Sequence, residues 1–297
     1  MTNHNTLILG IDGGGSKTLA RLCEPDGQIV AEKVAGPSSL TNNLDSACTL
    51  LRRLIDELCL ENAVNPAQLH VMAGLAGGGS TSRVKHLLAQ LPQDLASVRI
   101  ATDATTSLYG ANNGKPVCIV ALGTGSVAAR LNKDGTETLQ GGWGFIAGDE
   151  GSGAKLGLSA VKALLREIDR YQRPCSALGR AIASVTGDSR TQLLGWIAEA
   201  NPARYAALAP RVLAVADLCA AAQEVVAQHV NAVVNMINDI CEGNNYPVTL
   251  LGGLASATYA WLPASVQNVL TDPVGTSLDG ACWLAKQQLL SQPSQVS

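Results

Sequence analysis

The sequence has no excess of basic charge and no long apolar run. It holds 21 Lys and Arg against 24 Asp and Glu, which gives a net charge of −3, and the basic residues do not cluster. We therefore expect that nucleic acid is not the main partner, because nucleic acids select a basic surface. No apolar stretch approaches the ~20 residues that span a bilayer, and Leu7–Ile11 is too short for a signal-peptide core. These absences favour a cytoplasmic protein with no membrane partner.

Paired cysteines are also lacking. None of the eight cysteines forms a Cys-x-x-Cys pair, and none lies at zinc-ligand spacing from one of the four histidines. We expect reduced, mostly buried thiols and no structural zinc. The 297 residues, of which 46% are hydrophobic, suffice for a large core and predict two domains.

What the sequence does have is a glycine-rich turn that occurs twice. One apolar run ends at Asp12-Gly-Gly-Gly-Ser16, and a related run in the second half of the chain ends at Gly123-Thr-Gly-Ser126. Exposed backbone N–H groups in such turns form anion-binding concavities. The repeat therefore predicts two phosphate loops that hold one nucleotide between two similar halves.

The first loop differs from a P-loop. Gly10 and Gly15 have the separation of that motif, but Ser16 intervenes before Lys17. The loop also carries an acid, Asp12, directly after the strand, and a carboxylate beside a triphosphate is repelled unless a divalent cation lies between them. We interpret Asp12 as a residue that binds Mg²⁺ through a coordinated water molecule. The alternative is that Asp12 only caps a turn.

Strand and helix signals alternate along the chain. The apolar spacing over Leu44–Leu58 predicts an amphipathic helix, and a break at Asn112–Pro116 separates the two halves. The second half is strongly helical, with one helix expected from Leu208 to Glu242 and a last one over Ser277–Leu290. This alternation predicts an α/β fold with sites at the carboxyl ends of the strands.

Asp103 follows an expected strand and opens a helix. A carboxylate there can take the proton from an attacking hydroxyl and hold that oxygen in line with a phosphoryl group. The alternative is a helix N-cap, a position that Asp favours. Together with two phosphate loops, Asp103 is the candidate catalytic base.

Two further glycine-rich stretches are candidate ligand contacts. Gly141–Gly153 is dense in glycine, which suits close approach of the backbone to a ligand; Trp143 could face a sugar or base, and Asp149 could accept hydrogen bonds from sugar hydroxyls. Gly252–Ser256 follows a strand and suits contact with the adenosine part of a nucleotide. The alternatives are that Asp149 caps the next helix, that Trp143 belongs to the core, and that the last stretch is an ordinary connection.

Taken in order, these motifs resemble the N-acetylglucosamine kinases of the BadF/BadG/BcrA/BcrD ATPase family, within the actin-like ATPase superfamily. The resemblance spans nearly the whole chain. It rests on Asp12–Ser16, Leu40–Asn43, Thr102–Ala104, Gly123–Ser126, Gly141–Gly144, Gly148–Ser152 and Gly252–Ser256.

The resemblance implies two ribonuclease-H-like domains with a cleft between them. They would cover residues 1–113 and 114–276, the second with a helical insertion, and a C-terminal helix and tail over 277–297 would pack back on the first domain. The resemblance also implies ATP and Mg²⁺ as cofactors, with the following assignment. Asp103 is the base, Asp12 serves the metal, Asn42, Ser126, Gly142, Trp143, Gly144 and Asp149 contact the sugar, and Gly13, Gly14, Gly15, Ser16, Gly123, Thr124, Gly252, Gly253 and Ser256 contact ATP.

The expected function is ATP-dependent phosphorylation of N-acetylglucosamine at its 6-hydroxyl. A glucosamine or glucose kinase of the same fold remains an alternative. An ATPase activator of a dehydratase or reductase is less favoured, because Cys118 inside a strand and Cys241 at a helix end suit an iron–sulfur cluster poorly. A non-catalytic sugar sensor is also less favoured, because no DNA-binding segment precedes Leu7. The sequence leaves the oligomeric state open, with a homodimer as one candidate.

Overall fold

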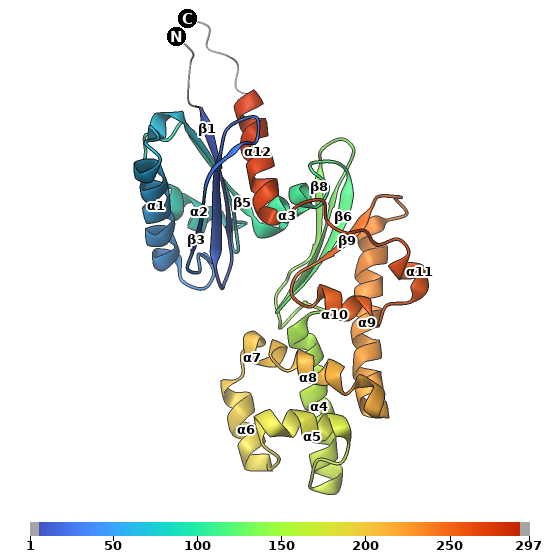
Figure 1. The fold of residues 1–297 in the computed structure, drawn as a ribbon. Helices are drawn as coiled ribbons and strands as arrows, with labels where there is room; N and C mark the ends of the chain where they lie inside the picture. The colour runs from blue at the N-terminus through green and yellow to red at the C-terminus, as the bar shows by residue number, and fades with distance from the viewer. Residues whose placement is uncertain (1–5, 292–297) are drawn as a thin grey trace, which may run out of the picture. The chain divides into compact units, whose positions relative to one another are not determined.

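The computed structural model describes residues 6–291 and divides the chain into two compact units (Figure 1). The first unit combines residues 1–117 with 273–297, and the second holds residues 118–272. The divisions fall where β6 begins and just before the last helix, and the tail after Ser291 lies outside the described residues. Each unit is built on one sheet.

The sheet of the first unit has the strand order β3-β2-β1-β4-β5. The first three strands are antiparallel neighbours, whereas β4 and β5 run parallel to β1. Because the parallel strands end at the same edge, the residues that follow β1, β4 and β5 are brought together there. The strands are β1 (Leu7–Gly13), β2 (Thr18–Cys23), β3 (Ile29–Ala35), β4 (Leu69–Leu75) and β5 (Ser97–Thr102).

Helices cover both faces of this sheet, which is why β1 is apolar from Leu7 to Ile11, before Asp12. Leu9 and Ile11 pack into a core with α1 and α2, while Ile8 on the opposite face packs with Ala281 and Ala285 of α12. Figure 1 shows α1 and α12 on opposite sides of the sheet. The helical segments are α1 (Leu44–Glu61), η1 (Pro66–Gln68), α2 (Thr81–Leu88), α3 (Asp103–Ala111) and α12 (Ser277–Ser291).

The sheet of the second unit has the order β8-β7-β6-β9, with β9 parallel to β6 and β8 antiparallel to β7. Its strands are β6 (Val117–Leu122), β7 (Ser126–Leu131), β8 (Glu137–Gly141) and β9 (Val248–Leu251). Its helical segments are α4 (Gly153–Tyr171), α5 (Ala177–Thr186), α6 (Arg190–Glu199), α7 (Pro202–Ala206), α8 (Ala209–Ala214), η2 (Ala216–Leu218), α9 (Ala220–Cys241), α10 (Ala255–Tyr259) and α11 (Ala264–Gln267).

The single helix predicted from Leu208 to Glu242 is wrong. The structure has α8, the short η2 and α9 instead, and Cys219 before α9 is extended, with φ −161°. Val212, Ala216 and Ala222 are all buried across the break, so the apolar pattern continues although the helix does not. Among the described residues, no helix is long and apolar enough to cross a membrane.

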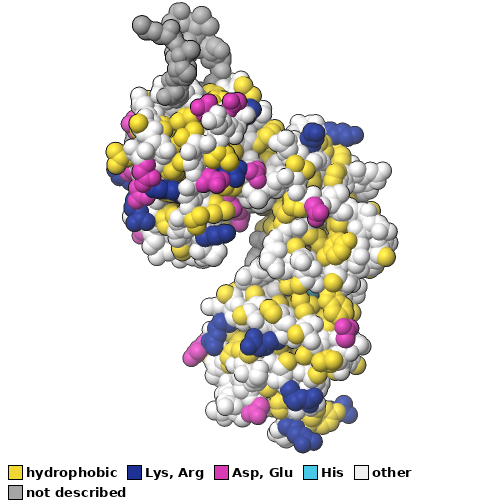
Figure 2. All heavy atoms as spheres, viewed as in Figure 1, with side chains coloured by type: hydrophobic (Ala, Val, Ile, Leu, Met, Phe, Trp, Pro, Cys, Tyr) yellow, Lys and Arg dark blue, Asp and Glu magenta, His cyan; other side chains and the backbone are white. Residues whose placement is uncertain are grey.

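Acidic and basic side chains are mixed on the face of the first unit that Figure 2 shows. On the face of the first unit seen in Figure 2, Lys and Arg alternate with Asp and Glu rather than forming one patch. Two of the ion pairs in this unit show how the signs are interleaved: Lys33 lies 2.9 Å from Glu57 and 2.7 Å from Glu61. This mixing agrees with the nearly balanced charge of the chain.

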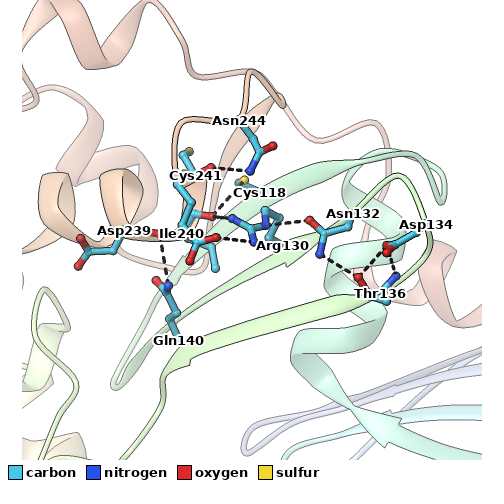
Figure 3. Close-up of polar contacts among 11 residues, drawn as sticks. Cys118, Arg130, Asn132, Asp134, Thr136, Gln140, Asp239, Ile240, Cys241 and Asn244 are labelled. Atoms are coloured by element: carbon cyan, nitrogen blue, oxygen red, sulfur yellow. Dashed lines mark hydrogen bonds and ion pairs between the residues drawn. The ribbon is translucent and has the colours of Figure 1, made fainter.

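A buried arginine ties the β7–β8 hairpin to the end of α9 (Figure 3). Arg130 of β7 is 7% exposed and donates hydrogen bonds to the carbonyl of Ile240 at 2.8 Å and to Glu242 at 2.8 Å. Gln140 of β8 donates to the carbonyl of Asp239 at 3.3 Å. The last carbonyls of a helix have no partner within the helix, so these donors satisfy them and fix the hairpin against α9.

We expect Arg130→Met to lower the free energy of unfolding by about 2–4 kcal/mol, because it removes the guanidinium donor of the Ile240 carbonyl and the ion pair with Glu242. Urea unfolding would measure the loss. Arg211→Met is the matched control: Arg211 is exposed on α8, and its loss should cost less than about 0.5 kcal/mol. Equal losses in both variants would contradict this role for Arg130.

Candidate active site

The first cluster of predicted residues lies at the edge of the first sheet where the parallel strands end. Asp12 is near the end of β1, and Asp103 follows directly after β5 as the first residue of α3. The two carboxylates are close enough that the charge of Asp103 raises the pKa of Asp12. Two acids about 90 positions apart in the sequence therefore meet because their strands share one sheet edge.

Asp12 is half-buried and held by the last helix. Ser277, the first residue of α12, donates a hydrogen bond to its carboxylate at 3.0 Å, and the Ser277 hydroxyl also lies 2.7 Å from that of the buried Thr106 on α3. Burial raises the pKa of Asp12, while the hydrogen bond from Ser277 and the charge of Lys17 lower it. These contacts give the Asp12 carboxylate one fixed orientation.

Asp103 is not the cap of its helix. The N-cap of α3 is Thr102, whose hydroxyl accepts a hydrogen bond from the N–H of Thr105 at 3.0 Å. The carboxylate of Asp103 accepts from the N–H of Ala104 at 3.0 Å and is exposed at the surface. Protein packed behind it raises its pKa by partial desolvation, against the effect of that hydrogen bond. The carboxylate is thus free to contact a ligand.

The loop that follows β1 is tightly built and open on one side. A Cβ on Gly13 would collide with Ser38, so only glycine fits there, whereas Gly15 and Ser16 are exposed. The side-chain nitrogen of Asn42 lies 3.4 Å from where a Cβ of Gly15 would be. The structure therefore brings the predicted sugar contact Asn42 beside the predicted ATP loop, which consists of Gly13, Gly14, Gly15 and Ser16.

The second cluster lies in the second unit, where β6 and β9 end. Gly252 has φ +92°, and a Cβ there would collide with the carbonyl oxygen of Leu122, so the turn after β9 rests against the end of β6. The turn after β6 is held by the N–H of Gly153, which donates to the carbonyl of Gly123 at 2.8 Å. Both turns leave polar groups exposed. These are Thr124, Gly253 and Ser256.

The loop from Gly141 to Ser152 carries the other predicted sugar contacts. Trp143 is 80% exposed, so the alternative that it belongs to the core is wrong; its glycine neighbours Gly142 and Gly144 have φ of +70° and +86°. Ser126 donates to the carbonyl of Glu150 at 2.6 Å and so braces the loop.

Asp149 in this loop is a buried acid without a partner. It is 8% exposed, and among the described residues its carboxylate has no hydrogen bond or ion pair. It faces a cavity of about 330 Å³ that Ser126 and Gly141 also line. A carboxylate in this setting can accept hydrogen bonds from a group that enters the cavity.

Two residues that contribute to these clusters, Phe145 and Ser277, were not singled out from the sequence. Phe145, the only phenylalanine, stacks on Tyr205 of α7 with ring centroids 5.4 Å apart, and Lys155 lies 5.6 Å from its ring, which anchors the loop. A lone aromatic residue in a glycine-rich loop was a usable signal. Ser277 gave no signal, because 265 residues separate it from Asp12.

Two α/β units with open glycine turns at the carboxyl ends of parallel strands define a nucleotide-binding protein of the actin-like ATPase fold. The chain belongs to the BadF/BadG/BcrA/BcrD ATPase family, whose model matches residues 9–277. The family predicted from the ordered motifs is confirmed by this match.

Individual relatives are similar over much of the chain. A solved structure from Chromobacterium violaceum, assigned as an N-acetylglucosamine kinase, is 32% identical and has a TM-score of 0.85. The match covers 95% of this chain and 99% of that one. A glucosamine kinase of Vibrio cholerae is 26% identical over 282 residues, 93% of this chain and 95% of that protein. An N-acetylmuramic acid/N-acetylglucosamine kinase of Clostridium acetobutylicum is 32% identical over 171 residues, so the chain spans about half of its length (55% of each chain).

Proposed function

We propose that this protein is an ATP-dependent sugar kinase that phosphorylates N-acetylglucosamine at the 6-hydroxyl. The observation that carries the proposal is one loop that holds both the buried, unpartnered carboxylate of Asp149 and the exposed side chain of Trp143. A carboxylate accepts hydrogen bonds from sugar hydroxyls, and an exposed indole offers an apolar face to a sugar ring. The names of the relatives from Chromobacterium violaceum and Clostridium acetobutylicum support the same substrate.

Asp103 is the proposed base. Its carboxylate would accept the proton of the sugar 6-hydroxyl and hold that oxygen in line with the transferred phosphoryl group. The raised pKa favours this role, because the carboxylate holds a proton more readily than an ordinary aspartate does. Asp149 would bind sugar hydroxyls, and the other proposed sugar contacts are Asn42, Ser126, Gly142, Trp143 and Gly144.

The glycine turns of both clusters are the proposed ATP contacts. Gly13, Gly14, Gly15 and Ser16 would contact phosphate oxygens from the first unit, and Gly123 and Thr124 from the second. Gly252, Gly253 and Ser256 would contact the adenosine part. The exposure of Ser16, Thr124 and Gly253 supports this assignment, because these groups are free for a ligand.

The surroundings of Asp12 fit a magnesium ion. Mg²⁺ prefers oxygen ligands, keeps several waters and is usually held by one or two carboxylates. Burial first, and then the like charge of Asp103, raises the pKa of Asp12, and a divalent cation beside the two carboxylates would offset both effects. When bound, the ion would neutralise charge on the phosphate oxygens. Asp12 would hold it through coordinated water.

A glucosamine kinase is the second candidate, favoured by the similarity to the Vibrio cholerae protein over 93% of the chain. ADP release with N-acetylglucosamine, glucosamine and glucose, in the presence of Mg-ATP, would compare the candidates. We expect the highest kcat/KM with N-acetylglucosamine. ADP release that no sugar stimulates would contradict the kinase proposal. ADP release with glucosamine alone would make glucosamine, not N-acetylglucosamine, the proposed substrate.

Ser277→Ala is expected to raise the KM for Mg-ATP about three- to tenfold, because a hydrogen bond to a carboxylate contributes about 1.5–3 kcal/mol and only part of that energy orients Asp12 toward the metal. The sugar KM should change little, because Ser277 orients the carboxylate of Asp12, which is proposed to serve the metal and not the sugar. Calorimetric binding of ADP with and without Mg²⁺ would give the same answer without turnover. Ser277→Thr keeps the hydroxyl and should restore most of the affinity; a Thr variant as weak as the Ala variant would contradict this role.

A further inference from the structure

The cavity beside Asp149 extends from the proposed sugar contacts to one face of α9. We call it the hairpin cavity, because the β7–β8 hairpin forms one wall and α9 the other. Its α9 residues recur at helical spacing and so share one face of that helix. The cavity is lined by Ser126, Ala128, Gln140, Gly141, Asp149, Glu150, Ala232, Asn235, Met236 and Asp239.

The lining carries negative charge only. Three of the ten lining residues are acids, Asp149, Glu150 and Asp239, and none of the described residues that line it is Lys, Arg or His. Asp149 is the buried, unpartnered acid described above, so the negative charge at the wall nearest the proposed sugar site is not internally compensated.

Of these three acids only Glu150 has an ion pair among the described residues, with Lys155. Arg130 already donates hydrogen bonds to Glu242 and to the carbonyl of Ile240. The carboxylate of Asp239 points away from Arg130 (Figure 3). Lys155 forms an ion pair with Glu150 at 3.8 Å, on side chains that are partly exposed. The negative charge of the cavity that no described cation balances is therefore that of Asp149 and Asp239.

The cavity also offers neutral hydrogen-bonding groups. Gln140 uses its amide nitrogen on the carbonyl of Asp239, which leaves its amide oxygen as an acceptor. Asn235 has no hydrogen bond among the described residues and lies on the exposed side of α9. Amide groups of this kind can bind an acetamide or an amine.

We infer, on the basis of the proposed kinase function, that the hairpin cavity selects the sugar substrate by charge, with Asp239 as a specificity-determining residue. Amino sugars whose substituents are neutral or cationic enter the cavity. Sugars that carry a carboxylate, such as N-acetylmuramic acid with its lactyl group, are rejected by like-charge repulsion and by the absence of a cation to pair with. The chain then differs from the Clostridium acetobutylicum relative, whose name includes N-acetylmuramic acid.

The test compares kcat/KM for N-acetylglucosamine, glucosamine and N-acetylmuramic acid. For the unmodified protein we expect N-acetylmuramic acid to be at least about tenfold poorer than N-acetylglucosamine, since a factor of ten corresponds to ~1.4 kcal/mol. Asp239→Lys should improve N-acetylmuramic acid relative to N-acetylglucosamine by roughly tenfold and weaken glucosamine, because it places a cation at the wall. Asp239→Asn should shift both ratios in the same directions by about threefold.

Asp217→Asn is the control, because it removes an exposed carboxylate of η2 that does not line the cavity, and it should leave all three ratios unchanged. Asp239 is exposed, so its variants should fold, and thermal melting would verify this. Equal use of N-acetylmuramic acid and N-acetylglucosamine by the unmodified protein would overturn the inference, as would ratios that do not move with Asp239. If no sugar is phosphorylated, the proposed function fails instead.

Discussion

Asp103→Asn is expected to lower kcat by ~10²–10⁴-fold, the usual cost of removing a general base. The variant should still fold and bind sugar, because Asn has the size of Asp and Thr102, not Asp103, caps α3. Asn cannot take the proton from the attacking hydroxyl. The effect should appear in kcat rather than in sugar affinity, because proton removal belongs to the transition state.

Steady-state kinetics and thermal melting would test this together. Thr102→Ala is the contrasting variant, because it removes the cap and should cost about 1 kcal/mol of stability while keeping the base. An Asp103→Asn protein that folds and turns over at the unmodified rate would show that the base lies elsewhere, with Asp149 as the next candidate.

The pH dependence should follow the same carboxylate. The pKa of Asp103 is raised above its usual value of 3.8, and the deprotonated form is the active base. As pH falls through this raised pKa, Asp103 gains a proton and kcat should fall. The fall of kcat at low pH should therefore be centred above pH 3.8, and it should be absent from the Asp103→Asn variant. An identical acid limb in both proteins would assign the titration to another group.

Asp149→Asn should weaken sugar binding by about 10–100-fold, because hydrogen bonds to a charged group contribute about 1.5–3 kcal/mol. The same change should leave stability equal or higher, since a buried carboxylate without a partner is unfavourable in the ligand-free protein. Asp149 has φ +64°, which Asn tolerates well, so the variant adds no backbone strain.

Sugar calorimetry and thermal melting would separate binding from structure. Asp149→Ala is a useful companion, because it removes the side chain but places Ala at a positive φ, which should cost stability. A drop in stability of Asp149→Asn with unchanged sugar affinity would mean that the carboxylate supports the loop and does not bind the sugar.

The residues that the sequence predicted well are those set by short-range signals. Asp12 could be found because it ends the apolar run of β1, and Asp103 because it follows β5, since parallel strands end at one edge of a sheet. The strand expected before Gly252 is observed as β9 for the same reason, since an apolar run stops at a glycine pair. These signals need only a few neighbouring residues.

What could not be predicted depends on contacts between distant segments. The break before α9 lies inside a continuous apolar pattern, so periodicity could not show it. Ser277 contacts Asp12 only because α12 returns to the first sheet, and Asn235 and Asp239 line the hairpin cavity only because α9 packs on the β7–β8 hairpin. No local pattern encodes either packing.

The return of α12 also has a consequence for the order in which the protein matures. Residues 118–272 are contiguous, so the second unit can fold as soon as it leaves the ribosome, whereas the first unit needs both ends of the chain. Until α12 is synthesised, Ile8 and Met72 have no cover on one face of the sheet, and Asp12 has no Ser277 beside it. The acidic end of the first sheet is therefore completed last, and a chain that stops before Ser277 carries its phosphate loops without the contact that orients them.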